Sequence, residues 1–329
     1  MGRVLVTTLP KSGTHLLNLA MSRLGFERHL CDLREITSGI IEEDDAAARA
    51  HAARLVEILE KMPRNGYVID HVPYNPVLMH WLMKRNIRVV CLVRNPFDVV
   101  VSLAHHLKKH GKQGVPVEFT GHALQHWIAS KHAEAAPGQP QAPMAKRYFR
   151  RFDGWVRDGR ALIVRFESLV GPRGGGSFLR QVRAGMALRD FIGADLDTRS
   201  VARALSGAFN TRVGMFRKGQ IGSWKEEMHP RTAETMRRLY GPLIERWGYT
   251  FDGELAEPDS ELPPELNEAV AGLSDEIAEL QQLVHHLRSQ IGASDDDGGD
   301  AAASAESDFF NDDAPPVRSE EPEKLDTAS

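Results

Sequence analysis

The sequence predicts an α/β protein in which helices flank a parallel β-sheet, followed by a C-terminal coiled-coil helix and a disordered tail. Three observations support this fold class. Short apolar runs alternate with helical segments over the first 100 residues, a heptad repeat occupies residues 266–291, and residues 292–329 are strongly acidic. Alternating strand and helix signals are typical of a parallel sheet that is covered by helices.

The apolar runs define the sheet. Helices are expected from about His15 to Leu24, where Gly25 stops the first one, from about Pro76, and after Pro96. The four expected strands are VLVTT (4–8), YVID (67–70), RVVCLV (88–93) and ALIVRF (161–166).

Two stretches interrupt this pattern, at 110–122 and 135–143. The second reads AAPGQPQAP, and this richness in Pro and Gly is typical of a flexible loop. Loops beside an α/β core often carry binding residues, so both are candidates for an acceptor site. A turn at 171–177 then precedes a further helix, and another helix begins at His229 and Pro230.

Composition limits the class of protein. The 329 residues, 42% of them hydrophobic, are enough for a full core. The N-terminus shows no signal-peptide pattern and the apolar runs are too short to span a membrane, so we expect a soluble, cytoplasmic protein. Cys31 and Cys91 are too few for a disulfide framework or a cysteine zinc site, and we expect no metal. Reducing cytosol fits this cysteine content.

The charge is divided unevenly along the chain. The net charge of −4 combines a basic part, residues 1–252, with 38 Lys and Arg against 24 Asp and Glu, and an acidic part, residues 253–329, with 3 against 21. A basic surface suits a phosphorylated and sulfated cofactor, and it would equally suit nucleic acid or an acidic glycan. Charge alone therefore does not choose between these ligands.

The first candidate site is the loop PKSGT (10–14), between a predicted strand and helix. Backbone N–H groups at a helix N-terminus and the hydroxyl of Thr14 form an anion site, to which Lys11 adds a mobile charge. The loop is not a Walker A sequence, because its lysine precedes the glycine. The alternative is an ordinary strand-to-helix turn with a solvated lysine.

Two further segments carry phosphate-binding residue types. In VVCLVRNPFDVVVS (89–102), Arg94 ends a strand and Ser102 lies two turns into a helix, so both can face one phosphate. The alternative is that Arg94 pairs with Asp98. In MFRKGQIGSWKEEM (215–228), the cluster Arg217, Lys218 and Gly219 is a second candidate, although alone it would be a solvated charge pair.

Together these segments resemble the PAPS-dependent sulfotransferase family, in which PAPS is 3′-phosphoadenosine 5′-phosphosulfate. PKSGT (10–14) is similar to its 5′-phosphosulfate loop, RNPFDVVVS (94–102) to its 3′-phosphate motif, and FRKGQIGSWK (216–225) to its RKGxxGDWK loop. The resemblance spans Arg3 to Phe251 and implies a P-loop-like fold. It implies PAPS-binding residues, with Phe209 against the adenine: Lys11, Ser12, Gly13, Thr14, His15, Arg94, Ser102, Phe209, Arg217, Lys218 and Gly219.

Weaker matches suggest the catalytic base. VIDHVPYNP (68–76) occupies the place of the family's KTHLP segment, which makes His71 the candidate general base, since an imidazole suits removal of a hydroxyl proton. A structural histidine at a strand end is the alternative. Asp70 could orient or tune His71. VRFESL (164–169) resembles the family's YEDL segment, with Phe166 in the tyrosine position.

The sequence also departs from the family pattern. His15 replaces a phosphate-contacting threonine, and Leu16 replaces the tryptophan that stacks on adenine, so Phe209 would carry more of that stacking. Ile69 stands where the family has a lysine two residues before the base, which removes a positive charge near the sulfonate. Ser223 replaces a common aspartate.

The resemblance implies in-line transfer of a sulfonate to a hydroxyl or amine, with His71 as base and Lys11 stabilising the leaving 5′-phosphate oxygen. A P-loop nucleotide kinase would need a Walker A loop and magnesium ligands, which we do not find. A catalytically silent nucleotide-binding scaffold is a further alternative. The basic body weakly favours a carbohydrate or another large polar acceptor, and we expect no nucleic-acid partner.

Three regions are expected: a catalytic domain at 1–252, a coiled-coil helix at 262–291, and a disordered tail at 292–329 whose twelve acidic residues outweigh its apolar content. Leucine at every d position and β-branched residues at every a position favour a parallel homodimer through 266–291. The alternative is a helix that folds back on its own domain. The repeat consists of Leu266, Val270, Leu273, Ile277, Leu280, Val284, Leu287 and Ile291.

Overall fold

The computed structural model describes residues 2–40, 46–110, 121–130, 144–209 and 218–256, together with Gly272, Glu279, Gln282 and Leu283. Most of the predicted coiled coil, the whole acidic tail and the 135–143 loop lie outside these residues. So do most of the 110–122 stretch and Arg217.

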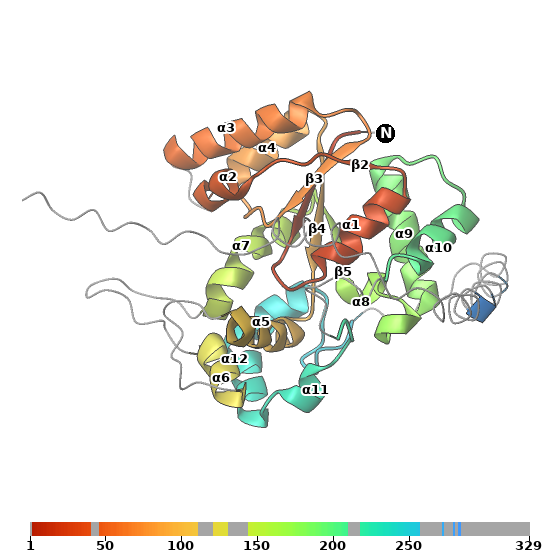
Figure 1. Ribbon diagram of the computed structural model, residues 1–329. Helices are drawn as coiled ribbons and strands as arrows, with labels where there is room; N and C mark the ends of the chain where they lie inside the picture. The colour runs from red at the N-terminus through yellow and green to blue at the C-terminus, as the bar shows by residue number, and fades with distance from the viewer. Residues whose placement is uncertain are drawn as a thin grey trace, which may run out of the picture.

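A five-stranded parallel sheet forms the centre of the molecule (Figure 1), in the order β2-β3-β1-β4-β5. The parallel α/β class predicted from the sequence is confirmed. β2, only two residues long, was not expected. The strands are β1 (Val4–Thr8), β2 (Glu27–Arg28), β3 (Gly66–Asp70), β4 (Arg88–Val93) and β5 (Leu162–Arg165).

The predicted helices at 15–24, 76 and 96 begin within one residue of their expected positions. α1 begins directly after Gly13, and Asn75 caps α4 by accepting a hydrogen bond from the Leu78 N–H at 2.9 Å. These three helices are α1 (Thr14–Arg23), α4 (Pro76–Lys84) and α5 (Pro96–His110).

The remaining helices include several that the sequence pattern did not mark. They are α2 (Arg34–Gly39), α3 (Ala46–Lys61), α6 (Gly121–Ser130), α7 (Met144–Asp158), α8 (Phe166–Leu169), α9 (Phe178–Ile192), α10 (Thr198–Ser206), α11 (Trp224–Glu227) and α12 (Pro230–Arg246), with a 3₁₀ turn at Pro172–Gly174.

Side chains that alternate along the strands supply two hydrophobic cores, one on each face of the sheet. Leu5 of β1 packs with residues of α3, α4, α5, α7 and α12. Its neighbours Val4 and Val6 point to the other face and pack with α1, α9 and α10. Burial on both faces is the usual environment of a parallel sheet.

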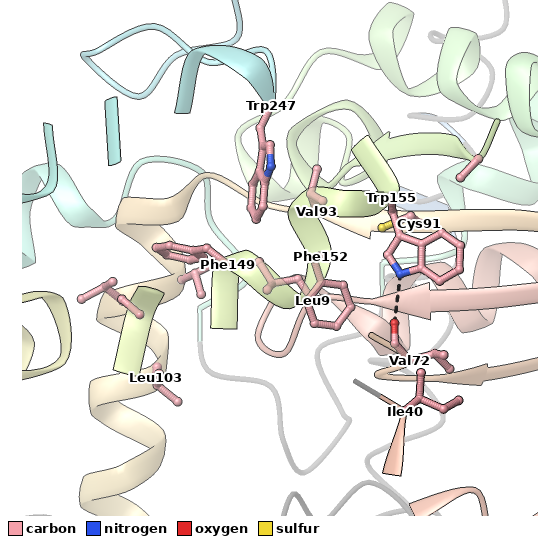
Figure 2. Packing of buried hydrophobic residues seen from close by; sticks show 14 of the residues in the cluster. Leu9, Ile40, Val72, Cys91, Val93, Leu103, Phe149, Phe152, Trp155 and Trp247 are labelled. Atoms are coloured by element: carbon pink, nitrogen blue, oxygen red, sulfur yellow. Dashed lines mark hydrogen bonds between the residues drawn. The ribbon is translucent and has the colours of Figure 1, made fainter. Parts of the chain in front are cut away.

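A buried tryptophan ties α7 to the segment that follows β3. Figure 2 shows the indole Nε1 of Trp155, which donates a hydrogen bond to the backbone oxygen of Val72 at 3.0 Å. The hydroxyl of Thr7 donates to the same oxygen at 2.7 Å. Val72 O therefore has two donors, and the chain after β3 is fixed where it leaves the sheet.

Three central strands end at the same edge of the sheet. β1 ends at Thr8, β3 at Asp70 and β4 at Val93, and the pairing of Thr7 with Asp70 and of Thr8 with Leu92 aligns these ends. In open α/β sheets, ligands bind at the carboxyl ends of the strands. The loops that begin with Leu9, His71 and Arg94 therefore converge on one place.

Candidate active site

The loop between β1 and α1 is held in one particular backbone shape. Gly13 has φ 101° and ψ 39°, and a Cβ there would lie 2.6 Å from the ring of Phe166, so this position needs glycine for two reasons. The Ser12 N–H donates to Leu9 O at 3.0 Å, and the Ser12 hydroxyl donates to Leu92 O at 3.3 Å. Lys11 is held in the left-handed region at φ 69°.

His71 lies beside this loop, and its ring is held by the backbone of Thr8. The imidazole Nδ1 is 2.6 Å from the Thr8 carbonyl oxygen and 3.0 Å from the Thr8 hydroxyl. Because a carbonyl oxygen can only accept, Nδ1 carries the proton and Nε2 holds the lone pair of the neutral ring. That is the nitrogen a general base would use.

Asp70 hydrogen-bonds to the main chain at His71. One carboxylate oxygen accepts from the His71 backbone N–H at 2.7 Å, and the other accepts from the Thr37 hydroxyl at 3.3 Å. Asp70 therefore fixes the main chain at His71, while Thr8 contacts the imidazole itself.

Arg94 connects the segments that the sequence marked separately. It is 8% exposed, and it donates to Lys11 O at 3.4 Å and to Gln220 O at 2.9 Å. Its guanidinium also stacks over Phe166, 4.4 Å from the ring centroid. Its Nε has no hydrogen-bond partner among the described residues, and such a buried, charged donor fits an anionic ligand.

The ion pair of Arg94 with Asp98, weighed above as an alternative, is long at 3.6 Å. The shorter bonds of Asp98 go elsewhere. Its carboxylate accepts from the Gly222 N–H at 2.9 Å and from the Trp224 N–H at 3.0 Å. Asp98, 1% exposed, thus holds the loop 218–224 against α5.

The loop 218–224 receives further contacts from the 3₁₀ turn. The Ile221 N–H donates to Gly174 O at 3.0 Å, and the Gln220 side chain donates to Arg173 O at 3.0 Å. Of the predicted ligands here, Lys218 pairs with Glu227 at 2.8 Å, and the same carboxylate lies 2.7 Å from Nε2 of His105.

Phe209, the predicted adenine contact, is 8% exposed and packs with the core beneath α10. Arg173 lies over its ring at 5.4 Å and donates to its carbonyl oxygen at 3.3 Å. Ser102 is half-buried in the second turn of α5, and His15 is half-buried in the first turn of α1.

A buried network fixes the turn after β4. Glu167 accepts from the Asn95 N–H at 3.0 Å and from the Tyr249 hydroxyl at 2.7 Å. Burial raises the pKa of the Glu167 carboxyl, and burial together with that carboxylate raises the pKa of Tyr249 well above its usual value. The Asn95 side chain also donates to Gly253 O.

Sequence reasoning missed Thr8 and Gln220 as parts of this site, and it considered Asp98 only as a partner of Arg94. The signal for Thr8 was a polar residue at the end of a buried strand, and for Asp98 a carboxylate in the first turn of a helix. Gln220 contributes a backbone oxygen and left no signal. Within the described ranges, no group of three or more His, Cys, Asp or Glu side chains could hold a metal ion.

A family model for the sulfotransferase domain matches residues 2–170. No curated protein matches the chain. Among solved structures, mouse sulfotransferase SULT7A1 complexed with PAP is 16% identical with a TM-score of 0.48, covering 84% of this chain and 89% of that one.

Retinol dehydratase in complex with androsterone and inactive cofactor PAP is 15% identical with a TM-score of 0.45, covering 74% of this chain and 80% of that one. A second retinol dehydratase structure, with retinol and PAP, is 15% identical with a TM-score of 0.44, covering 80% of this chain and 84% of that one.

No helix among the described residues is both long and apolar enough to cross a membrane.

Proposed function

This chain belongs to the sulfotransferase family, since the domain model matches more than half of it, and it is a sulfotransferase; from that premise we propose that it takes the sulfonate from PAPS and transfers it to a hydroxyl or amine of an acceptor. The position of Arg94 carries this proposal. Its hydrogen bonds to Lys11 O and Gln220 O bring the three motif segments together, and its buried Nε keeps a donor for a phosphate.

The proposed ligands bind the two ends of PAPS, its 5′-phosphosulfate and its 3′-phosphoadenosine part. Backbone groups of the 10–14 loop and the Thr14 hydroxyl face the 5′-phosphosulfate, with Lys11 as the mobile cation and His15 beside it. Arg94 and Ser102 bind the 3′-phosphate. The same phosphate is also bound by Arg217, Lys218 and the N–H of Gly219. Phe209 packs against the adenine.

The reaction needs one base and one cation. His71 takes the proton of the acceptor on Nε2, and a bond forms between the acceptor atom and sulfur. The bond from sulfur to the bridging 5′-phosphate oxygen breaks, and Lys11 stabilises the charge that this oxygen gains. Products are the sulfated acceptor and 3′-phosphoadenosine 5′-phosphate (PAP).

The charge of the molecule bears on the acceptor class. Residues 1–252 carry an excess of 14 positive charges, which supports a carbohydrate or another large polar acceptor over a small apolar phenol. Incubation of the full chain with ³⁵S-labelled PAPS and a panel of both acceptor classes, with mass spectrometry of the products, tests this. Transfer to phenols alone would remove the carbohydrate proposal.

Two measurements test the site. PAP should bind more tightly than AMP by calorimetry, and Arg217→Ala should weaken PAP binding about tenfold to more than a hundredfold, because a charge-assisted partner is lost. Equal affinity for AMP and PAP would contradict the 3′-phosphate assignment.

His71→Ala should lower turnover about 10²- to 10⁴-fold and leave PAP affinity nearly unchanged.

The quaternary structure is part of the proposal. Residues 266–291 form a parallel two-stranded coiled coil that makes the enzyme a homodimer, supported by the unbroken heptad repeat. Light scattering on the full chain and on a chain ending at Glu261 tests this. A monomeric full chain, or a dimeric shortened chain, would contradict it.

A further inference from the structure

Thr8 lies between the two halves of the proposed chemistry. It is the last residue of β1 and is fully buried. Its hydroxyl is 2.8 Å from the hydroxyl of Thr14, at the start of α1, and 3.0 Å from Nδ1 of His71. One buried side chain therefore touches both the anion loop and the candidate base.

The direction of this hydrogen-bond chain follows from the Thr8 carbonyl. That oxygen, 2.6 Å from Nδ1, can only accept, so the proton is on Nδ1 and is shared with the Thr8 hydroxyl oxygen. The buried Thr8 hydroxyl must then find an acceptor for its own proton, and Thr14 Oγ1 is the acceptor that the described residues offer. The Thr14 proton is left to point away from Thr8.

We propose that Thr8 is a positioning residue that sets both ends of this chain at once. Its hydroxyl helps to hold the proton of His71 on Nδ1, which leaves Nε2 basic. It also orients the Thr14 hydroxyl as a donor toward an anion bound at the 10–14 loop. This inference rests on the proposed function. Protonation of Nε2 leaves Nδ1–H a donor, so the chain keeps its direction during proton transfer.

The neighbouring residue Thr7 supplies a matched control. It is also fully buried at the end of β1, and its hydroxyl donates to Val72 O, one residue beyond His71. Removal of that hydroxyl leaves Val72 O bonded to Trp155 Nε1. Thr7→Val therefore removes a buried hydroxyl from the same strand and the same neighbouring segment without touching the imidazole or Thr14.

The experiment compares Thr8→Val, Thr8→Ser, Thr7→Val and Thr14→Val in the full chain, with PAP as the probe. ¹⁵N NMR of labelled histidine, with His71 assigned by its loss in His71→Gln, measures the fraction of neutral His71 protonated on Nδ1. Calorimetry measures PAP affinity. Both readouts are independent of the acceptor, and circular dichroism checks folding, with Thr8→Ala replacing Thr8→Val if the latter does not fold.

In the unaltered chain we expect His71 to carry its proton mainly on Nδ1. Thr8→Val should lower that fraction and weaken PAP binding about 2- to 10-fold, the effect of one net hydrogen bond. Thr8→Ser should keep the Nδ1 fraction and the PAP affinity of the unaltered chain, and Thr7→Val should change neither of them. Thr14→Val should weaken PAP binding and leave the Nδ1 fraction unchanged, since both Thr8 oxygens remain.

Three results would overturn the inference: a proton mainly on Nε2 in the unaltered chain, no change in either readout with Thr8→Val, or equal changes with Thr7→Val. Failure of the unaltered chain to bind PAP would instead contradict the proposed function. The NMR readout would still report whether Thr8 orients His71, so the two failures are distinguishable.

Discussion

The two loops proposed to hold the donor are anchored by different means. In the β1–α1 loop, local features set the backbone shape, namely the Ser12 N–H bonded to Leu9 O and a left-handed Gly13 at the start of α1. Hydrogen bonds to Leu92 O and from Arg94 add distant contacts. The loop 218–224 is fixed by distant groups, because the Gly222 and Trp224 N–H groups bond to Asp98, more than 120 residues away.

This difference indicates what each loop needs in order to work. The first loop needs a particular backbone shape, which local residue types supply. The second depends on the buried carboxylate of Asp98 and the guanidinium of Arg94, which α5 and the end of β4 hold in place. Substitutions should therefore disturb the first loop through strain and the second through lost partners.

The largest effect is expected where strain and packing add. Gly13→Ala places a Cβ 2.6 Å from the Phe166 ring at a φ of 101°. The left-handed backbone costs about 1–2 kcal/mol and overpacking about 1–3 kcal/mol of the free energy of unfolding. Thermal and denaturant unfolding should show this loss, and calorimetry should show PAP binding lost with it.

Gly25→Ala is the matched control for Gly13→Ala. Gly25 also has a positive φ, 87°, but a Cβ there meets nothing within 4 Å. It should cost only the backbone part, about 1–2 kcal/mol, and leave PAP affinity unchanged. Equal losses in the two variants would show that the contact with Phe166 does not contribute.

The difference between local and distant contacts also explains how far the sequence could predict the structure. β1 and β4 have the expected bounds because their apolar runs are local signals. β2, with two residues, leaves no such signal. Motif matches made Lys11 and His71 candidates for the site. The contact of His71 with Thr8 depends instead on the register of β1 beside β3, which periodicity does not specify.

The next largest effect is expected where a distant carboxylate anchors the loop 218–224. Asp98→Ala leaves the Gly222 and Trp224 N–H groups without their acceptor, which should cost about 1–3 kcal/mol of the free energy of unfolding. PAP affinity should fall about tenfold or more, because Lys218 and Gly219 lose their placement. Chemical denaturation and calorimetry measure the two effects.

Asp197→Ala provides the comparison for Asp98→Ala. Asp197 also accepts a backbone N–H, from Ser200, but it caps α10 on the surface. Its loss should cost about 0.5–2 kcal/mol and leave PAP affinity unchanged. If Asp98→Ala lowered stability and kept full PAP affinity, the loop 218–224 would not need this anchor for binding.

The smallest effect is expected at Glu227, where the second loop is held by a pair that competes with the ligand. Lys218 is 46% exposed and lies 2.8 Å from the Glu227 carboxylate, so the pair contributes about 0–1 kcal/mol. If Lys218 binds the 3′-phosphate as proposed, this carboxylate competes with the phosphate for its charge. Glu227→Gln should therefore raise PAP affinity, by about fivefold at most, with little change in stability. Calorimetry at low and moderate salt measures this gain, which should shrink as salt screens the pair.

Glu254→Gln, which removes the exposed partner of Lys225, is the control for Glu227→Gln and should leave PAP affinity unchanged. A fall in PAP affinity with Glu227→Gln would mean that the carboxylate positions Lys218 for the phosphate instead of competing with it.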